Sequence, residues 1–301
     1  MRKLIGRIYR INNKQNITLK INGKTMNAKN FLYENLKNEF KSTTGLADDN
    51  YLINLTNDWM NDANNSTERF KTHQLYFPQA NKILDMATGC GTFLFYGLLN
   101  GFDVEGVEPE KWKLEFLKKK IIEKNYPLDW EKKIFPSFGE NLPFDDEYFD
   151  VCSTYQTLEH VSNVQECLVE MLRVTKKGGG LHIICPDYRS TFEGHYRISW
   201  LPLFPRPLAK IYLRLRGKNP NYLDTINYVT EKRIRIILNK IATEKNYNIK
   251  IINVKKQNYL SHPKVKNSSF LPYLYLVFAS KIYLSKLCRS EVQTNMIVLK
   301  K

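Results

Sequence analysis

The sequence of 301 residues lacks a hydrophobic run long enough to cross a bilayer. One uncharged stretch near the C-terminus, residues 267–280, has only fourteen residues and is interrupted by Pro272. The N-terminus is basic but has no apolar segment of the kind found in secretion signals, so we expect a cytoplasmic protein. The five cysteines show no metal-ligand spacing, and their odd number favours reduced thiols over a disulfide framework.

Charge is distributed unevenly along the chain. Residues 1–188 hold 24 Lys and Arg against 25 Asp and Glu, whereas residues 189–301 hold 22 against 5. The whole net charge of +16 therefore arises in the C-terminal part. Such a region attracts phosphate in nucleic acid, in lipid headgroups or in a diphosphate-linked substrate. The alternative is that the surplus serves only solubility.

The middle of the chain alternates short apolar runs with helical segments. We expect strands at 82–86, 103–107, 134–135, 149–154 and 181–185, and helices at 91–99, 110–124 and 162–174. This rhythm is typical of βαβ units, which form a parallel sheet covered by helices on both faces. A composition of 43% hydrophobic and 25% charged residues is that of a globular chain and excludes a disordered or fibrous protein.

The flanking regions complete the predicted organisation. Residues 1–76 form an N-terminal extension, with a hairpin over 1–26 and helices after it, and residues 77–283 form the main domain. A proline-rich insertion, 189–229, follows the fifth strand. A helix over 231–242, capped by Thr230, precedes two antiparallel strands at 248–255 and 273–279. Residues 284–301 are expected to be a weakly held tail. The fold class is thus α/β, a doubly wound, mostly parallel, seven-stranded Rossmann-like sheet with an antiparallel last strand.

The most specific motif is a glycine-rich turn between the first strand and its helix, K-I-L-D-M-A-T-G-C-G-T over residues 82–92. Gly89 and Gly91 allow a ligand to approach the backbone closely, next to the positive end of a helix. Glu108, nineteen residues beyond Gly89, ends the second strand and can accept both hydroxyls of a ribose. An adenosine-type ligand across these strand ends is therefore expected. The alternative is a tight turn without a ligand.

The acid at the start of this turn distinguishes between adenosine cofactors. A dinucleotide site needs three glycines, and Asp85 would repel its pyrophosphate, whereas an acid suits a ligand with an ammonium group. The sequence here resembles the class I S-adenosylmethionine-dependent methyltransferases, of the type 11-like group, whose first motif is [D/E]-x-G-x-G-x-G. Asp85, Gly89 and Gly91 match this motif, and Ala87 stands at its first glycine.

Three further segments carry the resemblance in the same order. They are G-E-N-L-P-F-D-D-E-Y-F-D over 139–150, Y-Q-T-L-E-H-V over 155–161 and L-R-V-T-K-K-G-G-G over 172–180. Phe138 occupies the place where the family often has an Asp for the adenine amino group. The resemblance implies S-adenosyl-L-methionine as the cofactor. The residues that it places at this cofactor are Asp85, Ala87, Gly89, Gly91, Glu108, Pro109, Gly139, Glu140, Asn141 and Tyr155.

Methyl transfer is an in-line displacement at a sulfonium, and a hydroxyl acceptor also needs a base. The candidates at the strand ends are His160, Asp187 and His195, with His195 preferred because its loop leaves the sheet where acceptors would enter. Each has a structural alternative: a helix-start histidine, a turn residue and a loop histidine, respectively. We expect no metal site.

The sequence of the insertion suits two roles, a membrane-binding surface or a lid. Residues 200–207 are apolar and rich in proline, and a helix should follow from Pro207 to Gly217. Leu208, Ile211, Tyr212 and Leu215 form one stripe of this helix, and Arg206, Lys210 and Arg214 form a basic one. This pattern suits the inner face of an anionic membrane, with Trp200, Leu203 and Phe204 inserted, or a lid over the acceptor site.

The sequence does not determine the chemical identity of the methyl acceptor. The segment E-G-H-Y, starting at Glu193, and the basic helix after it look like methyltransferases that modify bacterial surface polysaccharides and lipids. A hydroxyl of a glycan or lipid-linked intermediate is therefore the leading expectation. A quinone-like or other small apolar acceptor is the second. Nucleic-acid modification through the basic C-terminal region is the third, although no RNA-binding module is visible.

Overall fold

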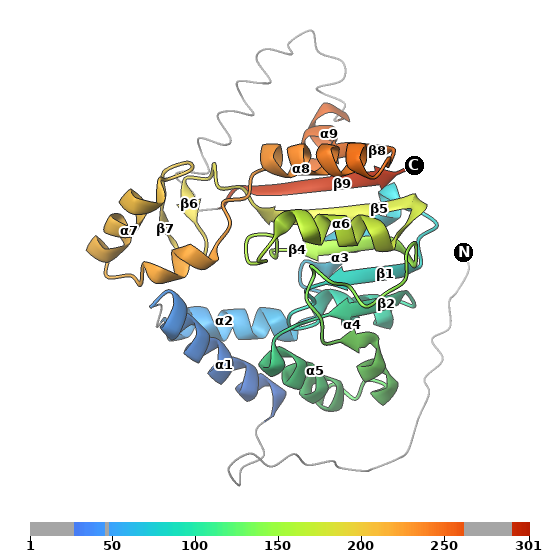
Figure 1. The fold of residues 1–301 in the computed structure, drawn as a ribbon. Coiled ribbons are helices and arrows are strands. Elements are labelled where there is room, and N and C mark those ends of the chain that lie inside the picture. The colour runs from blue at the N-terminus through green and yellow to red at the C-terminus, as the bar shows by residue number, and fades with distance from the viewer. Residues whose placement is uncertain (1–26, 46–47, 262–290) are drawn as a thin grey trace.

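The computed structural model describes residues 27–45, 48–261 and 291–301 (Figure 1). The hairpin predicted over 1–26, the strand predicted at 273–279 and Cys288 lie outside these residues. The other four cysteines, Cys90, Cys152, Cys167 and Cys185, are buried free thiols. In the part of the chain that the structure describes, no helix is both long and apolar enough to cross a membrane.

A seven-stranded sheet forms the centre of the protein, in the order β3-β2-β1-β4-β5-β9-β8. Its strands are β1 Lys82–Met86, β2 Asp103–Val107, β3 Ile134–Phe135, β4 Phe149–Tyr155, β5 Thr175–Pro186, β8 Ile249–Asn253 and β9 Gln293–Lys300. The pairs from β3 to β5 are parallel, and β9 pairs antiparallel with β5 and with β8. The predicted doubly wound, mostly parallel sheet with an antiparallel last strand is confirmed.

Helices cover both faces of this sheet. Successive side chains of a strand point to opposite faces, so each strand packs against helices on both sides. On one face Ile83 packs with Phe70 and with the helices after β1 and β2, whereas Leu84 and Met86 pack on the other with Leu168. The main helices are α3 Ser66–Tyr76, α4 Thr92–Leu99, α5 Lys111–Glu123, α6 Val164–Val174, α8 Glu231–Glu244 and α9 Val254–Ser261, with a 3-10 turn η1 Leu128–Lys133. Thr230 caps α8 as predicted, accepting a hydrogen bond from the backbone N–H of Arg233.

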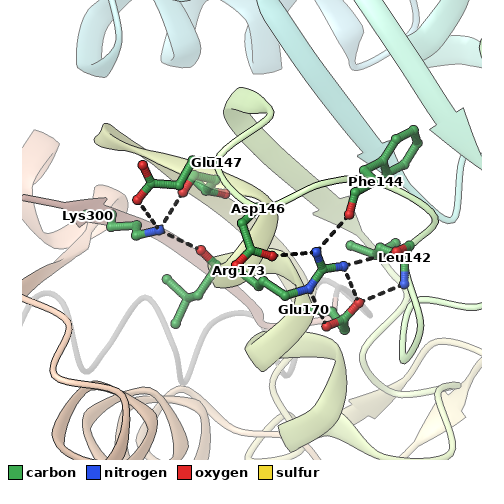
Figure 2. A network of polar contacts seen from close by, with 9 residues as sticks. Leu142, Phe144, Asp146, Glu147, Glu170, Arg173 and Lys300 are labelled. Carbon is green, nitrogen blue, oxygen red and sulfur yellow. Dashed lines mark hydrogen bonds and ion pairs between the residues drawn. The ribbon is translucent and has the colours of Figure 1, made fainter.

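The C-terminal segment is an inner strand of the sheet, next to the edge strand β8. The prediction of a weakly held tail is wrong for residues 293–300, because β9 fills the gap between β5 and β8. Lys300, 3% exposed, donates to the carbonyls of Leu172 at 3.0 Å and Thr175 at 2.6 Å, with Glu147 3.4 Å away (Figure 2). Its ammonium therefore anchors the end of β9 to the turn between α6 and β5.

Arg173 fixes the long loop that precedes β4. Its guanidinium, at the end of α6, pairs with Glu170 and Asp146 and donates to the carbonyls of Leu142 and Phe144 (Figure 2). The loop is tied to the helix that covers the sheet, so its earlier residues are held at the carboxyl ends of the strands.

Two N-terminal helices pack beside α5 in Figure 1, α1 Ala28–Thr43 and α2 Asp49–Met60. The buried ammonium of Lys120 in α5 joins them to the glycine-rich turn. It forms a 2.6 Å ion pair with Asp62 and donates to the carbonyls of Trp59 and Cys90. The extension is thus coupled to the turn that follows β1.

The insertion after β5 is a small subdomain at the left of Figure 1. It consists of β6 Phe192–Glu193, β7 Ile198–Ser199, α7 Arg206–Leu215 and the 3-10 turn η2 Asn221–Thr225. Trp200 and Phe204 are buried in its own core with Leu213, so they are not presented to a membrane as expected. Arg206 is half-buried, and its guanidinium donates to the carbonyls of Leu223 and Ile226. The predicted apolar stripe of α7 is exposed at Leu208, Ile211 and Leu215.

Candidate active site

A cavity of about 780 Å³ opens at the carboxyl ends of β1, β2, β4 and β5. Its wall on the strand side includes Asp85, Ala87, Gly89, Glu108 and Tyr155. This is the edge where open α/β sheets bind their ligands, because the loops after the strands diverge there. The N-terminal region contributes a further wall with Glu39, Phe40, Thr43, Thr44, Tyr51 and Trp59. The insertion contributes Gly194, His195 and Tyr222.

The turn after β1 has left-handed backbone at three positions. Ala87, Gly89 and Gly91 have φ values of 60°, 56° and 73°. Gly91 is required for two reasons. Its left-handed backbone favours glycine, and a Cβ there would lie 2.5 Å from a methyl group of Leu117. Asp85 accepts a 2.6 Å hydrogen bond from the Thr88 hydroxyl, which braces the turn from within. Burial raises the pKa of Asp85 to about 6, against the opposing effect of that hydrogen bond.

Glu108 connects the ends of β1 and β2. Its Oε2 accepts from the backbone N–H of Gly89 at 2.8 Å, and its Oε1 accepts from that of Glu110 at 2.9 Å. Burial raises the pKa of this carboxyl group. The carboxylate is therefore oriented by the glycine-rich turn itself while it lines the cavity.

Most residues expected at the cofactor come together in this cavity. Those that line it are Asp85, Ala87, Gly89, Glu108, Pro109, Glu140 and Tyr155, together with Phe138. Gly91, Gly139 and Asn141 are not among its described lining residues. A Cβ on Gly139 would lie 2.9 Å from the sulfur of Met86, so this glycine permits close packing behind the wall. Glu140 accepts from the backbone N–H groups of Ser162 and Asn163, which closes the loop around the cavity.

The two expected histidines meet in the wall of this cavity, in a part that we call the acceptor end and define by Glu159, His160 and His195. The Nε2 atoms of His160 and His195 lie 3.2 Å apart, and Glu193 Oε1 lies 2.7 Å from Nδ1 of His195. Burial works against a charge on His195, but the bond to Glu193 and the nearby carboxylates raise its pKa to about 9. Desolvation and the charge of His195 lower the pKa of His160 to about 3.

Asp187 does not belong to this group. Its carboxylate forms a 2.5 Å ion pair with Arg189 and accepts from the backbone N–H of Glu231 and the hydroxyl of Thr294. It is not among the described lining residues of the cavity. The expectation that Asp187 could act as a base is therefore corrected: it joins β5, α8 and β9.

Several lining residues escaped the sequence-based interpretation. Arg69 of α3 stacks on the Tyr155 ring, 4.0 Å from its centroid. Glu159 and Glu291 join the acceptor end from the loop after β4 and from the start of the last segment. Glu159 adjoins His160 in the sequence, which was a usable signal, whereas Glu291 lies in a stretch without any motif.

Comparison with known proteins agrees with this geometry. Residues 84–183 match the family described as "Methyltransferase domain". The chain carries a methyltransferase domain. An uncharacterized methyltransferase of Schizosaccharomyces pombe is 34% identical over 127 residues, which are 40% of this chain and 45% of that protein. A ubiquinone/menaquinone biosynthesis C-methyltransferase of Neisseria gonorrhoeae is 29% identical over 48% of this chain and 60% of its own length.

The chain spans about half the length of the curated relatives it matches. Among solved structures, phosphoethanolamine N-methyltransferase 2 of Haemonchus contortus, in complex with phosphomonomethylethanolamine and S-adenosylhomocysteine, aligns with a TM-score of 0.47 at 14% identity. That alignment covers 78% of this chain and 52% of the other. A SAM-dependent methyltransferase of Archaeoglobus fulgidus aligns with a TM-score of 0.45 at 17% identity, covering 78% and 92%.

Proposed function

We propose that this protein transfers a methyl group from S-adenosyl-L-methionine to an acceptor bound at the acceptor end. The observation that carries the proposal is the Glu108 carboxylate, held by the Gly89 N–H on the wall of one cavity. The residues present fit the cofactor. A carboxylate at the end of β2 suits the two hydroxyls of a ribose, and the glycine-rich turn leaves room for a ligand beside its backbone.

The side chains around the glycine-rich turn have separate roles in this proposal. Glu108 accepts hydrogen bonds from the ribose, and Asp85 offers a negative charge to the ammonium group. Tyr155, on whose ring the guanidinium of Arg69 stacks, forms the part of the cavity wall next to β5. Phe138 lines the cavity where the family often has an Asp, so it offers a ring face to the adenine in place of a hydrogen-bond acceptor.

We place a hydroxyl of a glycan or lipid-linked intermediate at the acceptor end. When bound, S-adenosylmethionine supplies a methyl group on a sulfonium, so transfer forms a C–O bond, breaks the C–S bond and leaves that electron pair on sulfur. The hydroxyl proton has to pass to a basic group of the wall. Of the groups present there, the imidazole of His160 is unprotonated at neutral pH because its pKa is lowered to about 3, whereas His195 already carries a proton because its pKa is raised to about 9. The carboxyl groups of Glu159 and Glu291 line the same wall.

The insertion supports a lipid-linked acceptor. Leu208, Ile211 and Leu215 project from α7 with 57%, 52% and 81% of their surface exposed. Residues 189–301 also carry 22 basic against 5 acidic side chains, which complements an anionic bilayer. We therefore propose reversible, peripheral binding to the inner membrane face through α7, with the cytoplasm as the compartment of the catalytic domain.

Vesicle flotation tests the membrane part. Wild-type protein should bind anionic vesicles at low salt and neutral vesicles poorly. Replacing Leu208, Ile211 and Leu215 together by Ser should remove the salt-resistant part of the binding. Ile236→Ser, an equally exposed apolar residue on α8, should leave it unchanged. Wild-type protein that does not float with anionic vesicles at low salt would contradict membrane binding and favour a soluble acceptor.

Product mass spectrometry tests the acceptor. Purified protein is incubated with methyl-labelled S-adenosylmethionine and fractionated lipids, glycans, quinones and tRNA. Label on an oxygen of a glycan or lipid-linked product is the expected result, and Glu108→Ala should abolish it. Label in the quinone fraction would replace our acceptor with the second candidate, which the named Neisseria relative favours. Label in tRNA would favour the third candidate.

A further inference from the structure

The acceptor end contains a group of ligand atoms that suits a cation. Nitrogen atoms of His160 and His195 and a carboxylate oxygen of Glu159 all lie within 4.8 Å of one another. The three residues come from two loops far apart in the chain, one after β4 and one between β6 and β7. All three line the cavity that also holds the proposed cofactor site.

The distances match those of two imidazoles sharing one metal ion. Nitrogen ligands at about 2.0–2.1 Å from a metal lie about 3.0 Å apart at right angles and about 3.4 Å apart at the tetrahedral angle. The two Nε2 atoms here are 3.2 Å apart. Glu159 Oε1 lies 3.9 Å from Nε2 of His160, and its carboxylate lies within 4.8 Å of the His195 ligand nitrogen, so it would move by about 1 Å to join them.

Glu159 adds an independent observation. The residue is 1% exposed, and its Oε2 has no hydrogen-bond partner among the described residues. A buried carboxylate oxygen without a partner is costly, since burial removes its hydration. A cation bound by both oxygens of the Glu159 carboxylate would supply the missing partner of Oε2.

The residue behind His195 has the arrangement found around metal-bound histidines. Glu193, also 1% exposed, lies 2.7 Å from Nδ1 of His195. It is itself held by the backbone N–H of Tyr196 at 2.7 Å and the hydroxyl of Tyr188 at 3.3 Å. A carboxylate on Nδ1 fixes the ring orientation and directs the free electron pair of Nε2 to the metal.

We propose that Glu159, His160 and His195 bind one divalent transition-metal cation, with Glu193 as the positioning residue of His195. Two imidazoles and one carboxylate favour Zn²⁺, Co²⁺, Fe²⁺ or Mn²⁺ over Mg²⁺ and Ca²⁺, which prefer oxygen ligands. Three protein ligands leave positions open toward the cavity, where an oxygen of the acceptor would complete the coordination. This role in acceptor binding rests on the proposed function, whereas binding of the cation does not.

Cobalt titration followed by visible absorption tests the site directly. Protein stripped with a chelator should take up one Co²⁺ per chain, with an absorption band that Zn²⁺ abolishes by competition. His160→Ala and Glu159→Gln should each weaken Co²⁺ binding at least about tenfold, and Glu193→Gln should weaken it about 10–100-fold. Glu166→Gln, exposed on α6, is the matched control and should bind Co²⁺ as the wild type does.

Two controls separate this proposal from the proposed function. His160 is partly exposed, so His160→Ala should fold even if the change at buried Glu159 does not, and circular dichroism checks both. S-adenosylmethionine binding, measured by calorimetry on the same stripped protein, should be independent of the metal. Absence of one-equivalent binding of Co²⁺, Zn²⁺ and Mn²⁺, or binding unaffected by His160→Ala, would overturn the cation site while leaving cofactor binding to be judged separately.

Discussion

The guanidinium of Arg197 in the insertion stacks on the ring of Tyr51 in α2, 4.0 Å from its centroid. Nearby, the side chain of Asn219 donates to the carbonyl of Ser42 at 3.0 Å. The two segments on either side of the methyltransferase domain thus touch each other, and Tyr51 and His195 line the same cavity. Part of the cavity wall therefore lies outside residues 84–183.

Arg197→Ala should loosen this contact. A partly exposed cation–π pair contributes about 0.5–1 kcal/mol, so amide hydrogen exchange in α2 should become about two- to fivefold faster. Arg216→Ala, exposed on the same insertion, is the control and should leave exchange in α2 unchanged. Equal exchange rates in wild type and Arg197→Ala would show that the insertion does not hold α2.

Affinity for S-adenosylmethionine should fall in acid because of Asp85. Its pKa is raised to about 6 by burial, so the ionised form predominates above pH 6 and is lost below it. At pH 5 about a tenth of the carboxylate remains ionised, and binding of an ammonium group should weaken up to about tenfold relative to pH 7. Calorimetric titration from pH 5 to 8 measures this change. Asp85→Asn should bind weakly at every pH, and a wild-type profile as flat as that of the variant would remove Asp85 from the site.

Substitution of His195 should lower turnover, whereas substitution of Asp187 should lower stability. His195→Ala should lower turnover by roughly two to four orders of magnitude, the range for loss of a group acting directly on the reacting atoms, with cofactor affinity preserved. Asp187→Asn should lower the free energy of unfolding by about 1–3 kcal/mol with turnover retained, because it breaks buried hydrogen bonds away from the cavity. Near wild-type turnover in His195→Ala would contradict its place at the acceptor end.

Lys300→Met should destabilise the protein. The change leaves the buried carbonyls of Leu172 and Thr175 without their donor, at a cost of about 1–3 kcal/mol. Urea unfolding compared with Lys301→Met, the exposed neighbour, isolates this effect. Equal midpoints for the two variants would mean that β9 is not anchored through its last buried lysine.

The sequence predicted the cofactor half of the site and the five strands up to β5, because both depend on local patterns. Asp85, Gly89 and Glu108 follow strands that read as apolar runs, and parallel strand ends meet at one edge. The position of β9 could not be predicted in this way. Its segment begins with polar residues, and its place between β5 and β8 depends on pairing with strands far away in the chain.

The acceptor end was predicted only in part. His160 and His195 were identified singly, but their meeting depends on the path of the insertion. Glu159 and Glu193 stand beside His160 and His195 in the sequence, but no spacing in the sequence relates the two pairs to each other. The helices α1 and α2 carried no motif, yet Glu39, Tyr51 and Trp59 from this region line the cavity.

Calorimetric titration of wild type and Glu108→Ala with S-adenosylmethionine tests whether the cavity at the ends of β1 and β2 binds this cofactor. Hydrogen bonds to a charged group contribute ~1.5–3 kcal/mol each, so the variant should bind at least about tenfold more weakly. Glu115→Ala on the surface of α5 should bind as the wild type does, and Glu108→Gln checks for effects on the fold of the turn. We expect one S-adenosylmethionine bound per chain and no comparable binding of NAD. Unchanged affinity in folded Glu108→Ala, or tighter binding of NAD than of S-adenosylmethionine, would contradict it.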